Sequence, residues 1–134
     1  MQTTNIWVNG CFDILHVGHI ELLKYAKSLG DALIVGIDSD DRIRLSKGPS
    51  RPFNSLEDRK RFLESIRHVD RVVSYSTDEG LETQLKKNKI DIMVIGSDWK
   101  GKRVVGEKIV KKVVFFDRIG KHSTTRILNN EVCI

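Results

Sequence analysis

Two histidines flank a glycine in GCFDILHVGH, residues 10–19, and their spacing suggests a site for a negatively charged group. An apolar run precedes this segment, and a helix is expected to begin near Val17 or Gly18. The first turn of a helix offers unpaired N–H groups and a positive dipole end. Residues three apart share one face of a helix, so His16 and His19 would point at the same anion. Gly18 would let that anion approach the backbone, and together these features predict a phosphate site.

The two histidines also have simpler interpretations. One of them can cap the helix, or the pair can bind zinc. Zinc requires further ligands at a fitting spacing, and the sequence shows none. Imidazole N–H groups are suited to stabilising charge on a transferring phosphoryl group, so we interpret His16 and His19 as catalytic phosphate ligands.

A second anion site is indicated by DRIGKHSTTRI, residues 117–127. Residues 123–125, Ser-Thr-Thr, stand where the last helix is expected to begin. One hydroxyl is enough to cap a helix, so three in a row after a glycine-lysine turn indicate a further role. Arg118 could reach either a phosphate or a ribose.

Two further segments carry candidate ligands. KGPSRPFNSLEDR, residues 47–59, contains Lys47, Arg51 and Arg59 around two prolines, which stiffen the loop and hold its cations in place at low entropic cost. A solvated basic loop is the alternative interpretation. In GSDWKGKR, residues 96–103, an aspartate at position 98 could bind a ribose or a base, and the following tryptophan could either stack on a ligand or cover the core.

The elements that would position these residues alternate between strand and helix. Short, β-branched runs predict buried strands of a parallel sheet at residues 5–8, 32–37, 71–75, 91–95 and 112–116. Helical periodicity predicts helices within residues 19–30, 55–69, 78–89 and 123–130. The pattern indicates an α/β fold with right-handed crossovers. Ligands would then bind beyond the carboxyl ends of the strands, at residues 9–19, 38–54, 96–103 and 117–125.

Length and composition restrict the function classes. The 134 residues predict one domain, residues 1–134, and a net charge of +5 favours an anionic partner. The basic residues are not interleaved with aromatic residues, which argues against nucleic acid as the partner. No apolar run is long enough to span a membrane, no signal peptide is evident, and the two cysteines, Cys11 and Cys133, fit a reducing cytoplasm. G-x-G-x-x-G does not follow the first strand, which excludes the usual dinucleotide site for hydride transfer. A Walker A motif is also absent.

Two of these segments resemble the signatures of the nucleotidyltransferase superfamily. GCFDILHVGH resembles its G-x-F-D-x-x-H-x-G-H motif, and RIGKHSTT resembles its R-x-x-G-x-S-T-T motif, so the likeness runs from about residue 5 to residue 130. IGSDWKGK and the arginine of DRIGKHSTT look like glycerol-3-phosphate cytidylyltransferase. NGCFDILHVGH, KGPSRPFNSLEDR and VVGEKIV look more like the heptose-1-phosphate adenylyltransferase domain. The chain departs from the cytidylyltransferases in Cys11, where they usually have threonine, in the lack of a lysine in SYSTDEG, and in GKH where they have EGI.

The resemblance implies a single Rossmann-like domain that transfers a nucleotidyl group by direct in-line attack of a phosphorylated acceptor, with release of pyrophosphate. The leading expectation is CMP transfer from CTP to a glycerol-3-phosphate-like polyol, and the alternative is AMP transfer from ATP to a sugar 1-phosphate. Mg²⁺ is expected with the nucleotide, without a set of protein ligands of its own, and the family implies a homodimer. The catalytic residues implied are His16, His19 and Lys47. The nucleotide would be bound by Gly10, Cys11, Phe12, Asp13, His16, Gly18, His19, Asp98, Arg118, Ile119, Gly120, Lys121, His122, Ser123, Thr124 and Thr125. The acceptor would be bound by Lys47, Arg51 and Arg59.

Overall fold

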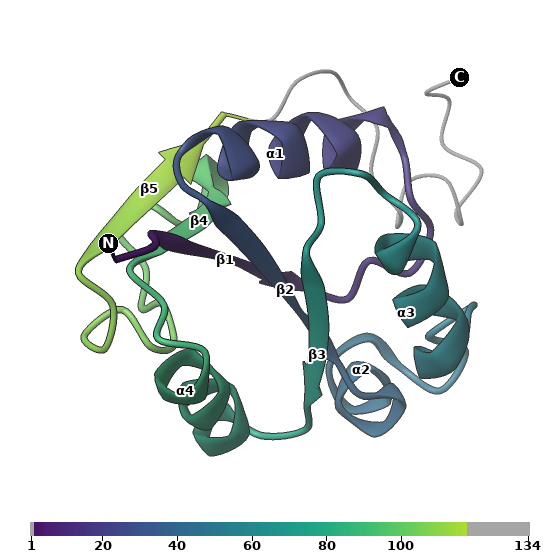
Figure 1. Cartoon of the computed structure of the whole chain (residues 1–134). Helices are drawn as coiled ribbons and strands as arrows, with labels where there is room; N and C mark the ends of the chain where they lie inside the picture. Colours follow the sequence, from purple (N-terminus) through teal and green to yellow (C-terminus); the bar gives the residue numbers. More distant parts are fainter. Residues whose placement is uncertain (1, 118–134) are drawn as a thin grey trace.

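The computed structural model describes residues 2–117, and within them five strands form one parallel sheet in the order β3-β2-β1-β4-β5 (Figure 1). The strands are β1 (Asn5–Gly10), β2 (Ala32–Asp38), β3 (Arg71–Tyr75), β4 (Ile92–Gly96) and β5 (Lys112–Phe116). Each agrees with a predicted strand to within two residues at either end. The predicted α/β class and parallel sheet are therefore confirmed.

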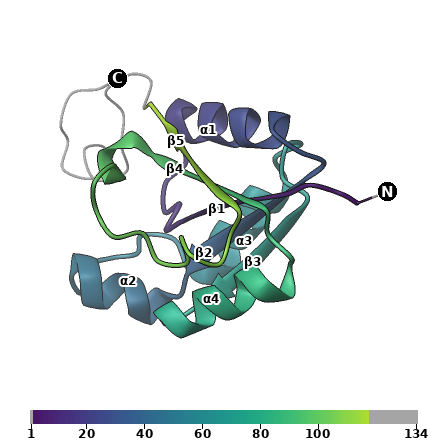
Figure 2. The ribbon, with the colours of Figure 1, turned by 90° about the vertical axis from the view of Figure 1, so that its left-hand side faces the viewer.

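Helices cover both faces of the sheet (Figures 1 and 2). They are α1 (Val17–Ser28), α2 (Asp40–Lys47), α3 (Leu56–Glu64) and α4 (Asp78–Lys87), and a short 3₁₀ turn, η1 (Ser97–Trp99), follows β4. Between residues 2 and 117, no helix is both long and apolar enough to cross a membrane.

The core has two layers, one on each side of the sheet, because successive side chains of a strand face opposite ways. On one side Ile6 and Val8 of β1 pack with Leu23 of α1 and Leu63 of α3. On the other side Trp7 of β1 and Met93 of β4 pack with Leu81 and Leu85 of α4 and with Val104, which follows η1. The central strands β1 and β2 are thus buried on both faces, as their continuous apolar runs predict.

The helix predictions were less accurate than the strand predictions. Helix α2 was not predicted, because Ile43 is the one side chain that it buries and its sequence therefore lacks an apolar stripe. Its capping chemistry was nevertheless present: Ser39 accepts a hydrogen bond from the Arg42 N–H at 3.2 Å, and two aspartates occupy the first turn. Helix α3 ends at Glu64, five residues before the predicted end.

The strand order reverses between β1 and β4. From β1 the chain moves outward to β2 and β3, and then returns to the other side of β1 to form β4 and β5. At such a switch point the loops beyond neighbouring strands diverge and leave a crevice at the carboxyl edge of the sheet. The loop that leads from β1 to His16 and the start of α1 begins at this point.

Gly36 provides a test of the packing between sheet and core. A Cβ at this position would lie 2.2 Å from the Trp7 ring, whereas a Cβ on Gly96 would meet no described atom within 4 Å. We expect Gly36→Ala to lower the free energy of unfolding by about 3 kcal/mol, because the indole cannot move without disturbing the core. Gly96→Ala, the matched control, should change it by less than about 0.5 kcal/mol, as measured by urea unfolding. Equal stability of the two variants would contradict this packing.

Candidate active site

A cleft of about 990 Å³ opens at the carboxyl edge of the sheet, around the end of β1. Its lining comes from the carboxyl ends of the strands, from the segments after β1, β2, β3 and β4, and from the start of α1. The structure brings eight of the predicted site residues together here: Gly10, Cys11, Phe12, His16, Gly18, His19, Lys47 and Asp98. These residues come from three segments far apart in the sequence, as the carboxyl-edge rule predicts.

His16 is the N-cap of α1, and His19 completes a reciprocal capping arrangement. The Gly18 N–H donates to Nδ1 of His16 at 3.1 Å, and the His16 N–H donates to Nδ1 of His19 at 3.3 Å. The two rings stack with their centroids 3.9 Å apart. Because Nδ1 of each ring accepts a backbone hydrogen bond, the proton of each neutral imidazole is on Nε2.

The two interpretations of the histidines are therefore compatible. His16 does cap the helix, but capping uses only Nδ1 and makes Nε2 a donor at the edge of the cleft. The stacked rings thus place their Nε2–H groups in the cleft lining, near the positive end of α1. This arrangement suits an anionic phosphate oxygen better than a metal ion, which needs an unprotonated nitrogen.

Phe12 adopts an unusual backbone conformation immediately before this site. Its φ of 46° lies in the left-handed region, which is costly for a residue with a side chain. The ring is buried and meets the edge of His19 at a centroid distance of 5.1 Å. The turn therefore uses the Phe12 ring to support His19, and the next side chain, Asp13, is directed into a different contact.

Asp13 was predicted to contact the nucleotide, but the structure gives it a structural role. Its carboxylate is buried and accepts hydrogen bonds from the N–H groups of Phe53 and Asn54, both at 2.8 Å. Nε of Arg51 donates to the same carboxylate at 3.0 Å. Asp13 therefore ties the loop after β1 to the loop before α3, and both of its oxygens are used within the protein.

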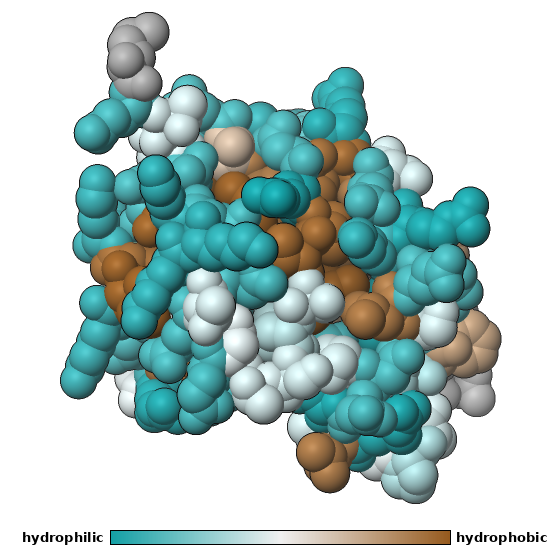
Figure 3. Space-filling view, turned by 60° about the horizontal axis from the view of Figure 1, so that its bottom comes forward, coloured by the Kyte–Doolittle hydropathy of each residue, from teal (hydrophilic) through white to brown (hydrophobic). Residues whose placement is uncertain are grey.

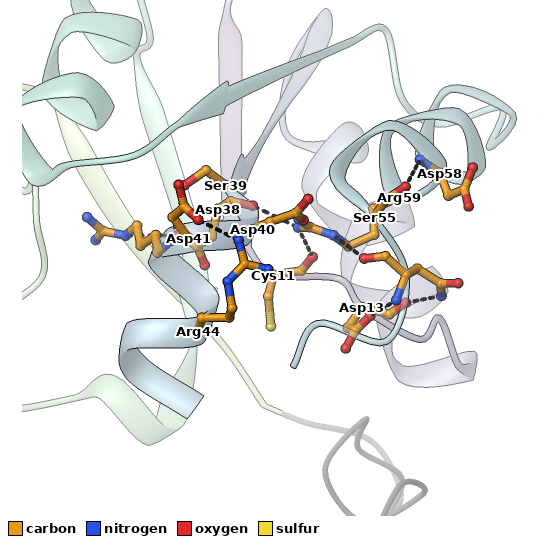
Figure 4. Close-up of polar contacts among 12 residues, drawn as sticks. Cys11, Asp13, Asp38, Ser39, Asp40, Asp41, Arg44, Ser55, Asp58 and Arg59 are labelled. Atoms are coloured by element: carbon orange, nitrogen blue, oxygen red, sulfur yellow. Dashed lines mark hydrogen bonds and ion pairs between the residues drawn. The ribbon is translucent and has the colours of Figure 1, made fainter. Parts of the chain in front are cut away.

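Arg51 and Arg59, predicted as acceptor ligands, are likewise held by contacts within the protein and do not belong to the cleft lining. Arg51 is almost buried against Asp13 and does not line the cleft. Arg59 is fully buried and donates to the carbonyl oxygens of Cys11 (3.0 Å), Asp38 (2.8 Å) and Asn54 (3.1 Å) and to the Asp40 carboxylate (2.6 Å). Figure 4 shows the Arg59 side chain between these groups. Its guanidinium thus holds three loops together and has no face directed at a ligand.

The arginine network explains why these loops keep their positions. A buried charge is tolerated only when it is paired and hydrogen-bonded, and Arg59 meets both conditions. Loss of one partner of such a pair typically costs about 3–5 kcal/mol. Lys47, in contrast, is exposed at the end of α2 and lines the cleft, so it alone among the three predicted acceptor cations lines the site in the described part of the chain.

The β4 side of the cleft carries Asp98 and Trp99, both in η1. Trp99 is 47% exposed, so it does not cover the core and its ring is available for stacking on a ligand. Nζ of Lys102 lies 5.9 Å from the centre of this ring. The structure thus resolves the choice left open by the sequence in favour of a cleft-lining tryptophan.

Several residues of the cleft were not singled out from the sequence. They are polar or aromatic groups at the ends of β1, β2 and β3 and in α2, namely Asn9, Asp38, Arg42, Tyr75 and Ser76. Asn9 and Asp38 directly follow predicted strands, and that position was the available signal. The face presented in Figure 3 is mainly polar, with apolar side chains visible between the polar ones.

The second predicted phosphate segment lies outside the described residues. It comprises Arg118, Ile119, Gly120, Lys121, His122, Ser123, Thr124 and Thr125, and their predicted roles stay predictions. Within residues 2–117, no three His, Cys, Asp or Glu side chains are grouped so that they could hold a metal ion. Mg²⁺ stays an expectation tied to the nucleotide.

A parallel sheet with a helix start and two histidines at its switch point is the arrangement that the nucleotidyltransferase resemblance implies. The chain belongs to the cytidylyltransferase-like family, whose model matches residues 7–128. The resemblance of GCFDILHVGH to this superfamily is thereby confirmed, and the chain is an enzyme of that class.

Comparison with known proteins finds relatives named HldE. The chain is 45% identical over 129 residues to "Bifunctional protein HldE" of Helicobacter hepaticus, covering 96% of this chain and 27% of that protein. It is 47% identical to the protein of the same name from a Nitratiruptor species, covering 92% of this chain and 26% of that protein. The chain therefore spans about a quarter of the length of these relatives. Among solved structures, a lipopolysaccharide core biosynthesis protein from Thermoplasma volcanium matches with a TM-score of 0.74 and 28% identity, covering 88% of this chain and 100% of that one.

The buried Asp13 carboxylate gives the fold a specific sensitivity to acid. Burial by itself raises the pKa of Asp13. Hydrogen bonds from the backbone of Asn54 and Phe53, with the charge of Arg51, outweigh burial and hold the pKa below the ordinary value of 3.8. The folded-state pKa is thus depressed, so the stabilisation is present above pH 3.8 and is lost as the pH falls below it.

We therefore expect Asp13→Asn to lower the free energy of unfolding at pH 7 by about 1–3 kcal/mol, because Asn cannot accept all three hydrogen bonds. The difference from the wild-type protein should shrink as the pH falls from 5 to about 3, as measured by urea unfolding across that range. Asp41→Asn is the control, because the Asp41 side chain is 87% exposed and pairs only with Arg44 among the described residues. A difference that is independent of pH would contradict the ionised state of Asp13.

Proposed function

We propose that this chain transfers AMP from ATP to a sugar 1-phosphate of the heptose type and releases pyrophosphate. The sequence resemblance to heptose-1-phosphate adenylyltransferase domains supports this, and the relatives named HldE cover almost the whole chain at 45–47% identity. The likeness to a lipopolysaccharide core biosynthesis protein also favours a sugar as the acceptor. The comparisons thus favour the alternative of the sequence analysis over transfer of CMP to a polyol phosphate.

The observation that carries the proposal is the pair of Nε2–H donors at the start of α1. In the proposed reaction an oxygen of the acceptor phosphate attacks the α-phosphorus of ATP. The bond from that phosphorus to the bridging oxygen breaks, and pyrophosphate leaves with the electron pair. His16 and His19 would donate to the α-phosphate oxygens, on which charge is concentrated in the transition state.

The remaining described residues would position the substrates. Lys47 extends over the cleft from α2 and would neutralise the acceptor phosphate. Asp98 and Trp99 would bind the ribose and the base on the β4 side of the cleft. The nucleotide would bring Mg²⁺, which lowers the charge of the triphosphate. A homodimer and a cytoplasmic location are further parts of the proposal, and they rest on the family resemblance and on the composition.

A second candidate is CMP transfer from CTP to a glycerol-3-phosphate-like acceptor. The segment IGSDWKGK, which begins at the end of β4, favours it, since it resembles the cytidylyltransferase branch and supplies four residues of the cleft. The two candidates make different demands on the base and on the acceptor, so one assay separates them.

The proposal is tested by pyrophosphate release with Mg²⁺, with ATP and CTP presented separately against heptose 1-phosphate, other sugar 1-phosphates and glycerol 3-phosphate. We expect release with ATP and a sugar 1-phosphate. Release only with CTP and glycerol 3-phosphate would overturn the main proposal in favour of the second candidate. No release with any combination would overturn both.

Substitution of His16 separates its capping role from its catalytic role. Asparagine is a good N-cap, so His16→Asn should keep the thermal midpoint of the protein within about 2–3 °C. It removes the Nε2–H donor, and kcat should fall by about 10² to 10³. His68→Asn is a matched control, because His68 does not line the cleft. Full activity in His16→Asn would reduce the residue to a helix cap.

A further inference from the structure

The hydroxyl of Tyr75 is a buried polar group without a partner among the described residues. Tyr75 ends β3, is only 5% exposed and lines the cleft. A buried hydroxyl normally finds a hydrogen-bond partner, because leaving one unpaired is unfavourable. An unpaired hydroxyl that lines a ligand cleft therefore points to a group supplied by the ligand.

Two further polar groups of the cleft lie close to this hydroxyl. Burial raises the pKa of Tyr75, and the neighbouring Asp38 carboxylate raises it further, while the Asn9 amide acts in the opposite direction. Neither neighbour makes a well-formed hydrogen bond to the hydroxyl. The three groups therefore converge on the same part of the cleft from the ends of β1, β2 and β3, which are adjacent in the sheet.

Asn9 and Asp38 are each oriented by a hydrogen bond from another side chain. Nε1 of Trp7 donates to Oδ1 of Asn9 at 2.8 Å, which leaves the Asn9 NH₂ as the donor for other contacts. Nε of Arg42 donates to Oδ1 of Asp38 at 3.1 Å. The subsite thus combines an amide donor, a carboxylate acceptor and a hydroxyl that can serve as either.

The charge of this subsite does not suit a phosphate. Arg42 lies over the Tyr75 ring, but it pairs with Asp38 and, at 2.8 Å, with Asp78, so its positive charge is compensated. The carboxylates would repel an anion. Uncharged hydroxyl groups, which both donate and accept, match such a set of groups far better.

The strand order separates this subsite from the nucleotide residues. In the order β3-β2-β1-β4-β5, the histidine pair follows β1, and Asp98 and Trp99 follow β4 on one side of it. Asn9, Asp38 and Tyr75 lie at the ends of β1, β2 and β3, toward the other side. With the reacting phosphates at the histidines, the nucleoside would extend toward β4, and the sugar of the acceptor would extend toward β2 and β3.

We infer that Tyr75, with Asp38 and Asn9, forms a subsite that binds hydroxyl groups of the acceptor's sugar body and selects polyhydroxylated acceptors. Tyr75 is the specificity-determining residue, because its buried hydroxyl makes no well-formed hydrogen bond within residues 2–117 and lies beside the Asp38 carboxylate and the Asn9 amide. The inference rests on the proposed function. It adds that the protein recognises the acceptor by the hydroxyl groups of its sugar.

The test compares the wild-type protein with Tyr75→Phe, using ATP and the best sugar 1-phosphate of the substrate panel. We expect the KM for the sugar 1-phosphate to rise about 3- to 10-fold, as for the loss of one hydrogen bond. The KM for ATP should stay within about 2-fold, because the hydroxyl lies on the other side of the histidines. The thermal midpoint should be unchanged or higher, because an unpaired buried group is removed.

Tyr25→Phe is the matched control, since Tyr25 lies on α1 against Phe116 and does not line the cleft. Monodeoxy analogues of the acceptor give a second readout. The wild-type protein should lose kcat/KM with at least one analogue, and Tyr75→Phe should not discriminate against that analogue. An unchanged acceptor KM in Tyr75→Phe, or an equal rise in the KM for ATP, would overturn the inference. No turnover by the wild-type protein with any sugar phosphate would overturn the proposed function itself, and this inference with it.

Discussion

The buried guanidinium of Arg59 is the interaction on which the arrangement of the cleft depends. It reaches from α3 to carbonyl oxygens after β1, after β2 and before α3, and it pairs with the Asp40 carboxylate in α2. The Asp13 carboxylate connects the loop after β1 to the loop before α3, because it accepts hydrogen bonds from residues 51–54. Buried charges that are fully paired hold one geometry, because any displacement leaves a charge without its partners. The loops at the carboxyl edge of the sheet are therefore held in place before a ligand arrives.

The two histidines at the start of α1 are oriented by the contacts around them. The first turn of the helix satisfies its N–H groups with Nδ1 of two histidines, and this use of Nδ1 determines which ring nitrogen carries the proton. The edge of Phe12 and the stack between the rings restrict how either imidazole can turn. A site whose donors are already oriented needs little reorganisation as charge develops, which is the main source of rate enhancement in phosphoryl and nucleotidyl transfer. Capping and the proposed catalytic role thus use different atoms of the same residues.

The sequence predicted the parts of the molecule that have a local signature. Continuous β-branched runs located all five strands, and the glycine between two histidines located the helix start and the site. The roles of charged residues were harder to predict, because a buried Arg59 and an exposed Lys47 look alike in sequence and differ only in what surrounds them. Helix α2 has no apolar stripe, so its capping residues alone did not predict a helix there. The sequence predicts Tyr75 only as the last residue of a strand. The packed structure is needed to show that its buried hydroxyl has no well-formed hydrogen bond among the described residues.

The claim that both histidines carry their proton on Nε2 can be measured directly by ¹⁵N–¹H correlation spectroscopy of the imidazole rings. The chain has four histidines, and the His16→Asn spectrum assigns one of the two signals of interest. We expect protonated Nε2 and unprotonated Nδ1 in both rings at pH above 7.5, and a change in the Nε2–H signals of both when a non-hydrolysable ATP analogue is added. A proton on Nδ1 of either ring, or unchanged Nε2–H signals at saturating nucleotide, would contradict the role assigned to the pair.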